Sequence, residues 1–518
     1  MTPTDAGSPR LRGDRPLLLA DLGDLVGDPV AGPADGVAVR GVTLASAEVV
    51  PGDLYAALPG ARTHGVQYVQ DAAARGAVAV LTDPAGRDAA LATGLPVCVA
   101  DDPRAVLGAV ADRVYGQPSS GLTVIGITGT NGKTTTAYLV EAGLDAAGRG
   151  TGLIGTVQTR TRGRDDAGRP TVTEIPSVRT TPEAPAVHAL LASMLTAGVS
   201  AVVMEVSSHA LVMGRVGGVR FAAAGFTNLG RDHLDFHADL EDYFQAKARL
   251  FDGRAARELV TVDDDAGRRL AGLRPDAATV AITGPADWTA SEVEPAPGGG
   301  STFTLHGPDG GTWPGRVRLP GRFNVANAVL AVALLDAVGV PVETALAGIA
   351  GTVVPGRMEP VDAGQPFVAV VDYAHTPDAV ATALTALRGS TSGRLITVLG
   401  CGGDRDRGKR GAMGTSAARL SDVLVVTDDN PRSEDPALIR AAMLAGLREV
   451  PEAERAEVHE IGDRRTAIGT AVGLARPGDT LLIAGKGHET GQEVAGTVHP
   501  FDDRTVLREA LAGTGAPA

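Results

Sequence analysis

The sequence is poor in cysteine and aromatic residues, and no long apolar run opens the chain. Its two cysteines, Cys98 and Cys401, are too few for a disulfide framework or a cysteine-based zinc site. Aromatic residues make up only 3% of the 518 residues, so aliphatic side chains must fill the core. No apolar segment typical of a secretion signal stands near the N-terminus. These features favour a reducing compartment, and we expect the protein to be cytoplasmic.

Positive charge is also in deficit. The chain has 47 Lys and Arg against 61 Asp and Glu, which gives a net charge of −14. Binding to nucleic acid or to an anionic membrane depends on excess positive charge, so we expect neither partner. The segment 184–204 has no charged residue but contains His188 and Gly198. We therefore predict a helix, a glycine cap and a strand there, not a membrane span.

The length predicts about three domains at roughly 100–200 residues each. A polar break at 116–121 and a linker at 351–357 suggest domains 1–118, 119–351 and 352–518. The first should contain a helix at 66–75 and strands at 37–44, 53–57 and 77–82.

The other two domains alternate strands with helices, which predicts an α/β fold with mostly parallel sheets covered on both faces. In the second domain we expect a helix at 323–338, an inserted surface hairpin within 295–315, and strands at 122–127, 201–206, 222–227 and 259–262. The third should be a Rossmann-like sheet with strands at 367–371, 395–399, 423–427 and 480–484. Such sheets bind ligands beyond the carboxyl ends of their strands. Here Asp372 and segments 402–405, 429–432 and 485–489 occupy those positions, so we expect them to converge.

A phosphate-binding loop is the clearest motif. Thr128-Gly-Thr-Asn-Gly-Lys-Thr134 stands between the strand at 122–127 and a helix at 135–147. Glycines turn backbone N–H groups toward phosphate, and the helix N-terminus adds partial positive charge. Lys133 would reach the β- and γ-phosphates, and the Thr134 hydroxyl would bind Mg²⁺. The general pattern has a glycine where this chain has Ile127, so the loop alone leaves open a chance Gly-Lys-Thr.

Several further motifs accompany this loop, and together they resemble the Mur ligase family and its folylpolyglutamate synthetase relatives. They are Thr180-Thr-Pro182, Glu205-Val-Ser-Ser-His-Ala-Leu211, the segment 227–237, Tyr243-Phe-Gln-Ala-Lys247, Gly321-Arg-Phe-Asn-Val325, Pro355-Gly-Arg-Met-Glu359 and Asp372-Tyr-Ala-His-Thr-Pro377. The resemblance extends from about residue 40 to about residue 505, and it is strongest to the members that add the third amino acid of the peptidoglycan precursor. It implies an N-terminal uridine-binding domain, a central P-loop ATPase-like domain and a C-terminal Rossmann-like domain.

The resemblance also implies ATP-dependent amide-bond formation through an acyl phosphate. Lys133, Glu205, His233 and Lys247 match the catalytic residues, with Lys247 carbamylated to N6-carboxylysine. Mg²⁺, expected as two ions, would be held by Thr134, Glu205, His233 and the carbamate. The expected contacts to ATP are Gly129, Thr130, Asn131, Gly132, Lys133, Thr134, Thr135, Asn324, Arg357, Asp372 and His375.

The remaining expected substrates are UDP-N-acetylmuramoyl-L-alanyl-D-glutamate and meso-2,6-diaminopimelate. The UDP-sugar dipeptide would contact Ser46, Thr180, Thr181, Ser207 and Arg215. Ala45, Ala47 and Met213 depart from the residues usual at these places in the family, so details of this contact are expected to differ.

The added amino acid would contact Arg405, Asp429, Asn430, Pro431, Arg432, Gly485 and Glu489. Arg432 is decisive because its guanidinium matches a carboxylate that diaminopimelate has and L-lysine lacks. The alternatives are a lysine-adding ligase, a turn without a binding role at 429–432, and a P-loop module that does not ligate. We expect a monomer.

Overall fold

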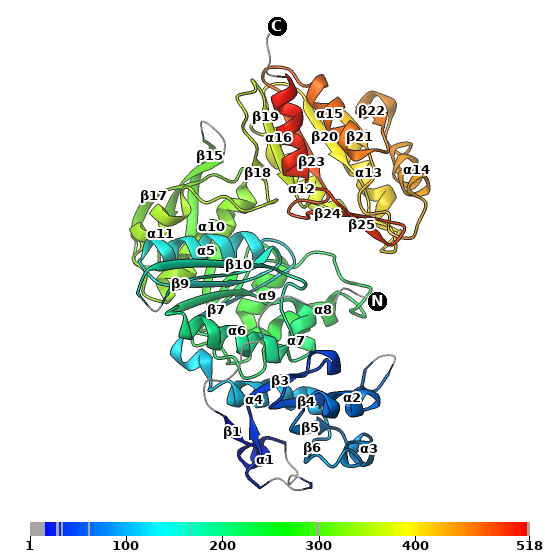
Figure 1. Ribbon diagram of the computed structural model, residues 1–518. Helices are drawn as coiled ribbons and strands as arrows, with labels where there is room; N and C mark the ends of the chain where they lie inside the picture. The colour runs from blue at the N-terminus through cyan, green and yellow to red at the C-terminus, as the bar shows by residue number, and fades with distance from the viewer. Residues whose placement is uncertain are drawn as a thin grey trace.

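The computed structural model describes residues 16–26, 31–32, 35–60, 63–165, 167–296 and 300–514. Three parts, each built on a sheet, follow one another along the chain (Figure 1). The first has a parallel sheet of order β3-β4-β5-β6. Its strands are β3 (Gly41–Thr43), β4 (Asp53–Ala57), β5 (Ala79–Thr82) and β6 (Val97–Val99), and its helices are α1 (Gly23–Val26), α3 (Arg87–Leu91) and α4 (Pro103–Val114).

Two predictions for this part need correction. The strand expected at 37–44 is two strands, because β2 (Ala38–Val39) pairs with β1 (Leu17–Leu18) whereas β3 joins the parallel sheet. The helix expected at 66–75 begins as a 3₁₀ turn at Gly65–Tyr68, where the His64 side chain accepts a hydrogen bond from the Val66 amide. The α-helix proper is α2 (Val69–Ala74).

The central sheet has eleven strands, in the order β10-β9-β8-β11-β7-β12-β13-β14-β15-β16-β17. Its middle is parallel and confirms the expected strands, with ends shifted by a residue. The expected strands are β7 (Thr123–Thr128), β11 (Ala201–Glu205), β12 (Ala223–Phe226) and β13 (Glu258–Thr261), and the parallel part also contains β8 (Thr151–Ile154), β14 (Ala278–Ala281) and β15 (Trp288–Pro295).

Antiparallel hairpins extend both edges of this sheet. One consists of β9 (Gln158–Arg164) and β10 (Pro170–Pro176), the other of β16 (Ser301–His306) and β17 (Thr312–Val317). The hairpin expected within 295–315 is present as β16 and β17, but it is not a separate insertion, since β16 pairs with β15 and continues the sheet. Phe303 and Leu305 explain this, because their side chains are buried in the core of the central part.

Helices cover both faces of the central sheet (Figure 1). One face packs on α5 (Lys133–Ala146), α10 (Arg322–Ala337) and α11 (Val342–Ile349), and the other on α6 (Ala184–Thr196), α7 (Ser208–Val212), α8 (Leu240–Ala248) and α9 (Asp265–Leu273). The segment 184–204 forms α6, a left-handed turn at Gly198 and β11, as predicted. Among the described residues, no helix is both long and apolar enough to cross a membrane.

The third part has a sheet of order β18-β19-β23-β20-β21-β22, parallel except for β18. The four expected strands are confirmed as β19 (Val368–Asp372), β23 (Thr480–Ala484), β20 (Leu395–Leu399) and β21 (Val423–Val426), and the sheet also contains β18 (Glu359–Pro360) and β22 (Glu457–Glu460). One face carries α12 (Pro377–Arg388), α13 (Lys409–Leu420) and α14 (Pro436–Leu447), the other α15 (Arg464–Leu474) and α16 (Asp503–Thr514). A short hairpin of β24 (Gly491–Val494) and β25 (Thr497–Pro500) follows β23.

The predicted α/β class with three successive sheet-based parts is thus confirmed, whereas the exact domain boundaries stay predictions. One hydrophobic cluster runs from the central part through Val354 of the linker into the third part, where it includes Val370 and Ala374.

Candidate active site

The loop after β7 has the shape that a phosphate site needs. Gly129 and Gly132 have φ angles of 146° and 88°, which favour glycine. A Cβ at Gly129 would lie 1.9 Å from Thr227 Oγ1, and one at Gly132 would lie 2.4 Å from Asn327 Oδ1. Both glycines are therefore required by conformation and by space. The loop leads directly into α5, which places the helix N-terminus at the site.

Neighbouring segments hold the loop in place. The Asn131 amide donates to Asn228 Oδ1 at 3.0 Å, and Thr227 Oγ1 donates to the Asn131 carbonyl at 2.6 Å. Thr130 Oγ1 donates to the Tyr243 hydroxyl at 3.2 Å. Thr135, in the first turn of α5, is buried.

Lys133 turns its ammonium back onto this loop. Nζ donates to the carbonyls of Gly129 and Thr130, both at 2.9 Å. Burial lowers the Lys133 pKa, although Glu205 and Asp232 oppose that shift. Neutral carbonyls are weak partners for an ammonium, so an anionic phosphate can replace them.

A chain of hydrogen bonds connects the loop to the Thr180 motif. Thr134 Oγ1 and Thr156 Oγ1 each donate to Glu205 Oε2 at 2.9 Å, and the Thr156 amide donates to Oε1 at 2.7 Å. Thr156 Oγ1 also lies 3.0 Å from Thr180 Oγ1. The hydroxyl of Thr134 and the carboxylate of Glu205 are oxygen donors of the kind that Mg²⁺ prefers, so this pair fits a magnesium site. Thr156 lies in no motif, and sequence reasoning missed it.

Lys247 is a buried lysine of α8. Its Nζ donates to the Gly129 carbonyl at 2.7 Å and lies 4.2 Å from the centre of the Tyr243 ring. Burial lowers the Lys247 pKa well below its ordinary value, and the charge of Lys133 lowers it further. An amine in this environment is readily neutral, and only a neutral amine adds CO₂ to form a carbamate.

His233 lies near Lys133 and Lys247 but does not contact Glu205 in the described structure. It has a φ of 54°, its Nε2 lies 3.5 Å from Asp232 Oδ2, and its ring packs edge-on against His209 at 4.9 Å. Desolvation lowers its pKa against the pull of Asp232, which favours the neutral imidazole that binds metals. Within the described ranges, no hydrogen bond or ion pair joins His233 to Glu205, and no group of three His, Cys, Asp or Glu side chains is assembled for a metal ion.

The third part reaches the phosphate loop through Arg357. Its Nη2 lies 3.4 Å from Thr134 Oγ1, its guanidinium stacks 4.5 Å from the centre of the Tyr373 ring, and its buried Nε has no partner among the described residues. Asp372 accepts hydrogen bonds from the amides of Met358 and Ala374, and burial raises its pKa. Arg357 thus lies at the interface between the two parts, and Asp372 holds the backbone next to Arg357 within the third part.

His375 and Asn324 are placed less directly. The His375 ring lies 4.5 Å from that of Tyr373, and burial lowers the His375 pKa. Asn324 is buried and donates to the Pro320 carbonyl at 2.8 Å. The residue that faces the loop at Gly132 is Asn327, which donates to Asn324 Oδ1 at 3.3 Å. Sequence reasoning missed Asn327, although it follows Asn324 by one helical turn.

Two of the other segments expected beyond the strand ends of the third sheet, 402–405 and 485–489, contact the loop 429–432. We call this loop the acceptor loop. Asn430 Nδ2 donates to Glu489 Oε2 at 2.7 Å. The buried Lys486 donates to Asn430 Oδ1 at 3.0 Å and to Glu489 Oε2 at 3.2 Å, and it lies 3.7 Å from Asp429. At Gly485, a Cβ would lie 2.6 Å from Asp429 Oδ2. Lys486 therefore fixes the orientation of both Asn430 and Glu489, a role that no sequence pattern indicated.

Arg432 stands at the end of this loop, after the buried Pro431, with 23% of its side chain exposed. Nη1 donates to the Gly403 carbonyl at 2.6 Å, and Nε lies 3.4 Å from Glu493 Oε2. Arg405 is not brought to the cluster: it is exposed and has no hydrogen bond or ion pair with the described parts of the chain.

The residues expected to bind the UDP-sugar dipeptide form two groups. Thr181 Oγ1 donates to the Glu205 carbonyl at 2.8 Å and accepts from the Ser207 amide at 3.1 Å. Arg215 Nη1 donates to the Thr181 carbonyl at 3.2 Å. Ser46 lies apart from them in the first part, at the start of the 3₁₀ turn Ser46–Glu48. There it donates to Asp71, whose pKa is lowered by Arg75 and by Ser46.

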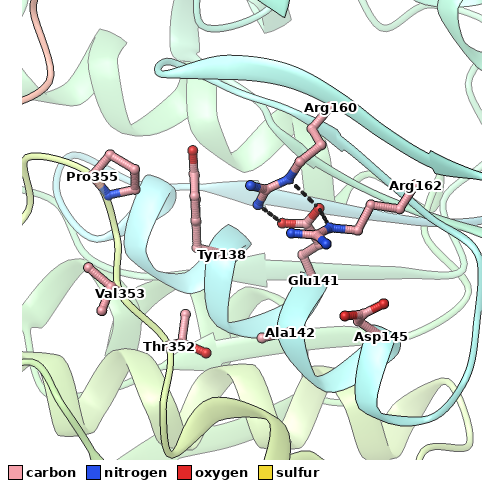
Figure 2. Close-up of a pocket in the computed structure, with 9 residues that line it drawn as sticks. All are labelled: Tyr138, Glu141, Ala142, Asp145, Arg160, Arg162, Thr352, Val353 and Pro355. Atoms are coloured by element: carbon pink, nitrogen blue, oxygen red, sulfur yellow. Dashed lines mark hydrogen bonds and ion pairs between the residues drawn. The ribbon is translucent and has the colours of Figure 1, made fainter. Parts of the chain in front are cut away.

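A separate hollow of about 230 Å³ lies along α5, where the linker crosses that helix (Figure 2). Arg160 and Arg162 of β9 both face Glu141 of α5, and Arg160 Nε donates to it at 2.8 Å. The hydroxyl of Tyr138 is buried without a partner in the described structure. The lining of the hollow includes none of the expected catalytic residues. It consists of Tyr138, Glu141, Ala142, Asp145, Arg160, Arg162, Thr352, Val353 and Pro355.

Comparison with known proteins matches each of the three parts. The model of the Mur ligase family catalytic domain matches residues 38–115, that of the Mur ligase middle domain 127–335, and that of the Mur ligase glutamate ligase domain 356–487. The chain is similar to the UDP-N-acetylmuramoyl-L-alanyl-D-glutamate--2,6-diaminopimelate ligase of Streptomyces avermitilis, with 53% identity over 99% of both chains. The ligase of the same name from Corynebacterium glutamicum is 48% identical, over 95% of this chain and 97% of its own.

A solved structure of a UDP-N-acetylmuramoyl-L-alanyl-D-glutamate--2,6-diaminopimelate ligase is also similar. It aligns with a TM-score of 0.69 and 29% identity, over 96% of this chain and 99% of that one. Relatives with 53% and 48% identity span nearly the whole chain, and family models match all three parts. The chain therefore belongs to the Mur ligase family.

Proposed function

We propose that the protein is an ATP-dependent ligase that joins meso-2,6-diaminopimelate to the D-glutamate carboxylate of UDP-N-acetylmuramoyl-L-alanyl-D-glutamate. The observation that carries the choice of amino acid is that the acceptor loop brings both charges to one place: it bears the Arg432 guanidinium, and its Asn430 donates to the Glu489 carboxylate. The distal carbon of diaminopimelate bears a carboxylate and an ammonium, which suit Arg432 and Glu489 respectively. The similarity to ligases named for the same reaction supports this choice.

The chemistry begins at the phosphate loop. A carboxylate is a poor electrophile, so the γ-phosphoryl group of ATP is first transferred to a D-glutamate oxygen, and ADP leaves. Lys133 and the N-terminus of α5 stabilise the charge on the transferred group, while Arg357 lies close enough to Thr134 to approach it. Bound Mg²⁺, proposed as two ions, would neutralise phosphate charge next to Thr134, Glu205, His233 and Lys247.

The amide bond forms in the second step. The amine of diaminopimelate attacks the acyl carbon, phosphate leaves with the bonding electron pair, and the nitrogen loses a proton. The acceptor loop contributes by positioning, which brings the amine within reach of the acyl phosphate. No side-chain nucleophile is required.

The site assignments extend this proposal. Lys247 is carbamylated, and its buried, easily deprotonated amine supports that modification. The UDP-sugar dipeptide contacts Ser46, Thr180, Thr181, Ser207 and Arg215, and Asn327 joins Asn324 beside the nucleotide loop. The monomeric state and the cytoplasmic location stay predictions.

The test is phosphate release by the purified protein with ATP, Mg²⁺ and the UDP-muramoyl dipeptide, with and without an amino acid. We expect release to depend on meso-diaminopimelate and to be far slower with L-lysine. Faster release with L-lysine would instead identify a lysine-adding ligase, and release indifferent to any amine would identify a non-ligating nucleotide-binding module.

A further inference from the structure

The backbone of β24 fixes the acceptor loop. The Arg432 amide donates to the Glu493 carbonyl at 3.0 Å, and the Ala495 amide donates to the Arg432 carbonyl at 2.7 Å. The Glu493 amide donates to Asn430 Oδ1 at 3.0 Å. Because all of these bonds use backbone atoms of β24 and its turn, substitution of the Glu493 side chain leaves them intact.

The Glu493 side chain, in contrast, pairs with the side chain of Arg432. Its Oε2 lies 3.4 Å from Arg432 Nε, and this is the ion pair of Arg432 within the described structure. The side chain of Glu493 is 40% exposed and that of Arg432 is 23% exposed, so the pair borders solvent. The neighbouring Asp404 is engaged elsewhere, since its carboxylate accepts hydrogen bonds from the amide and the hydroxyl of Ser433. Glu493 is thus the carboxylate that pairs with the Arg432 guanidinium, the group proposed to bind the incoming amino acid.

We infer that Glu493 is an internal counter-ion that occupies Arg432 in the free enzyme and yields it to the distal carboxylate of the incoming amino acid. This inference rests on the proposed function. The exchange replaces one carboxylate with another, so Arg432 is paired before and after binding. Only an acceptor with its own distal carboxylate can complete the exchange, which makes Glu493 a specificity-determining residue that weakens acceptor binding to sharpen selection.

The inference predicts a change confined to acceptor binding. In Glu493→Gln, the guanidinium loses its competitor, so the KM for meso-diaminopimelate should fall by about two- to fivefold, the range of a solvent-bordering ion pair. The kcat and the KM for ATP should not change. Glu493→Asp retains a carboxylate and should behave more like the wild type. As a matched control we choose Glu457→Gln, because Glu457 is an exposed glutamate on β22 that pairs with His459.

A double substitution separates competition from a structural effect. If Glu493 acts through Arg432, then adding Glu493→Gln to Arg432→Met should leave the KM for meso-diaminopimelate at the value of Arg432→Met alone. An unchanged or higher KM in Glu493→Gln, or the same fold-change in both backgrounds, would overturn the inference. A wild-type protein with no release dependent on meso-diaminopimelate would overturn the proposed function itself, and the inference with it.

Discussion

Lys247 shows how one buried side chain can acquire an unusual chemistry. Its ammonium is enclosed against the Tyr243 ring and the Gly129 carbonyl, and Lys133 adds a like charge nearby. Burial and the like charge of Lys133 disfavour the protonated form, so the amine becomes neutral at a lower pH than an exposed lysine does.

We predict that Lys247 carries a carbamate that is lost as the pH falls. Protonation of the amine removes the lone pair that holds CO₂, so acidification through the lowered pKa of Lys247 should release it and reduce kcat together. The measurement is the ¹³C NMR carbamate signal of protein equilibrated with ¹³C-bicarbonate, recorded with kcat as a function of pH. Lys247→Arg serves as the control without a reactive amine. A signal that persists in Lys247→Arg would contradict the assignment.

We predict that Arg432→Lys impairs acceptor binding specifically. Lysine keeps the charge but loses the planar pair of donors, and a charge-assisted hydrogen bond is worth about 1.5–3 kcal/mol. The KM for meso-diaminopimelate should therefore rise about tenfold or more, while the KM for ATP stays unchanged, as measured by initial rates of phosphate release. Equal changes in both constants would point to a disturbed fold.

At the scale of elements, a buried ion pair joins α16 to α15 and to the end of β23 in the third sheet. Arg464 of α15 and Asp503 of α16 form a pair with two hydrogen bonds of 2.7 Å, and both side chains are 0% exposed. Arg464 also donates to the Ala484 carbonyl at the end of β23, directly before Gly485. The pair therefore supports the segment that carries Lys486 and Glu489.

We predict that Asp503→Asn loosens this region by about 3–5 kcal/mol, because it leaves the buried guanidinium without its counter-charge. The measurement is hydrogen exchange of the amides of α16 and β23, which reports the free energy of local opening. Glu509→Gln is a suitable control, since Glu509 pairs with Arg465 at the surface and should matter by less than about 1 kcal/mol. Equal effects of the two substitutions would refute the role of the buried pair.

The elements that the sequence predicts well are the ones with a clear apolar pattern. β4, β20 and β23 have the expected bounds because each is a short apolar run followed by a turn. β9 was missed because its sequence, Gln-Thr-Arg-Thr-Arg-Gly-Arg, is polar and has no apolar alternation. The pairing of β16 with β15 depends on a contact between segments, which local pattern does not contain.

The same limit applies to the site. Lys133, Glu205 and Arg432 stand in motifs, so the sequence could propose them. Thr156 and Glu493 stand in none, and each enters the site because a hairpin brings it there. Arg405 illustrates the converse, since its motif is present but its side chain is exposed.

At the scale of the whole molecule, the three parts lie in a row, with the nucleotide loop on the central sheet and the acceptor loop on the third (Figure 1). The sequence predicts the order of these parts but not the contacts between them. Arg357 provides one such contact, because it belongs to the third part and reaches Thr134 of the phosphate loop. The phosphate loop and the acceptor loop must act together, so closure of the central and third parts is expected during the reaction.

We predict that Arg357→Ala lowers kcat by about 10- to 100-fold, because the phosphoryl group loses a cation supplied from the second half of the site. The KM for meso-diaminopimelate should change little, since the acceptor loop is untouched. Initial rates of phosphate release measure both constants. Arg465→Ala removes an exposed arginine of the same part and should leave both unchanged. A loss of acceptor binding without a loss of kcat would contradict this role.

The central claim is that the guanidinium of Arg432 selects an amino acid with a distal carboxylate. A competition measures it most directly: the protein receives ATP, Mg²⁺, the UDP-muramoyl dipeptide and equal concentrations of meso-diaminopimelate and L-lysine, and mass spectrometry identifies the product. We predict that the wild type forms almost only the diaminopimelate product and that Arg432→Lys loses much of this preference. A mainly lysine-containing product, or an identical preference in both proteins, would contradict the account.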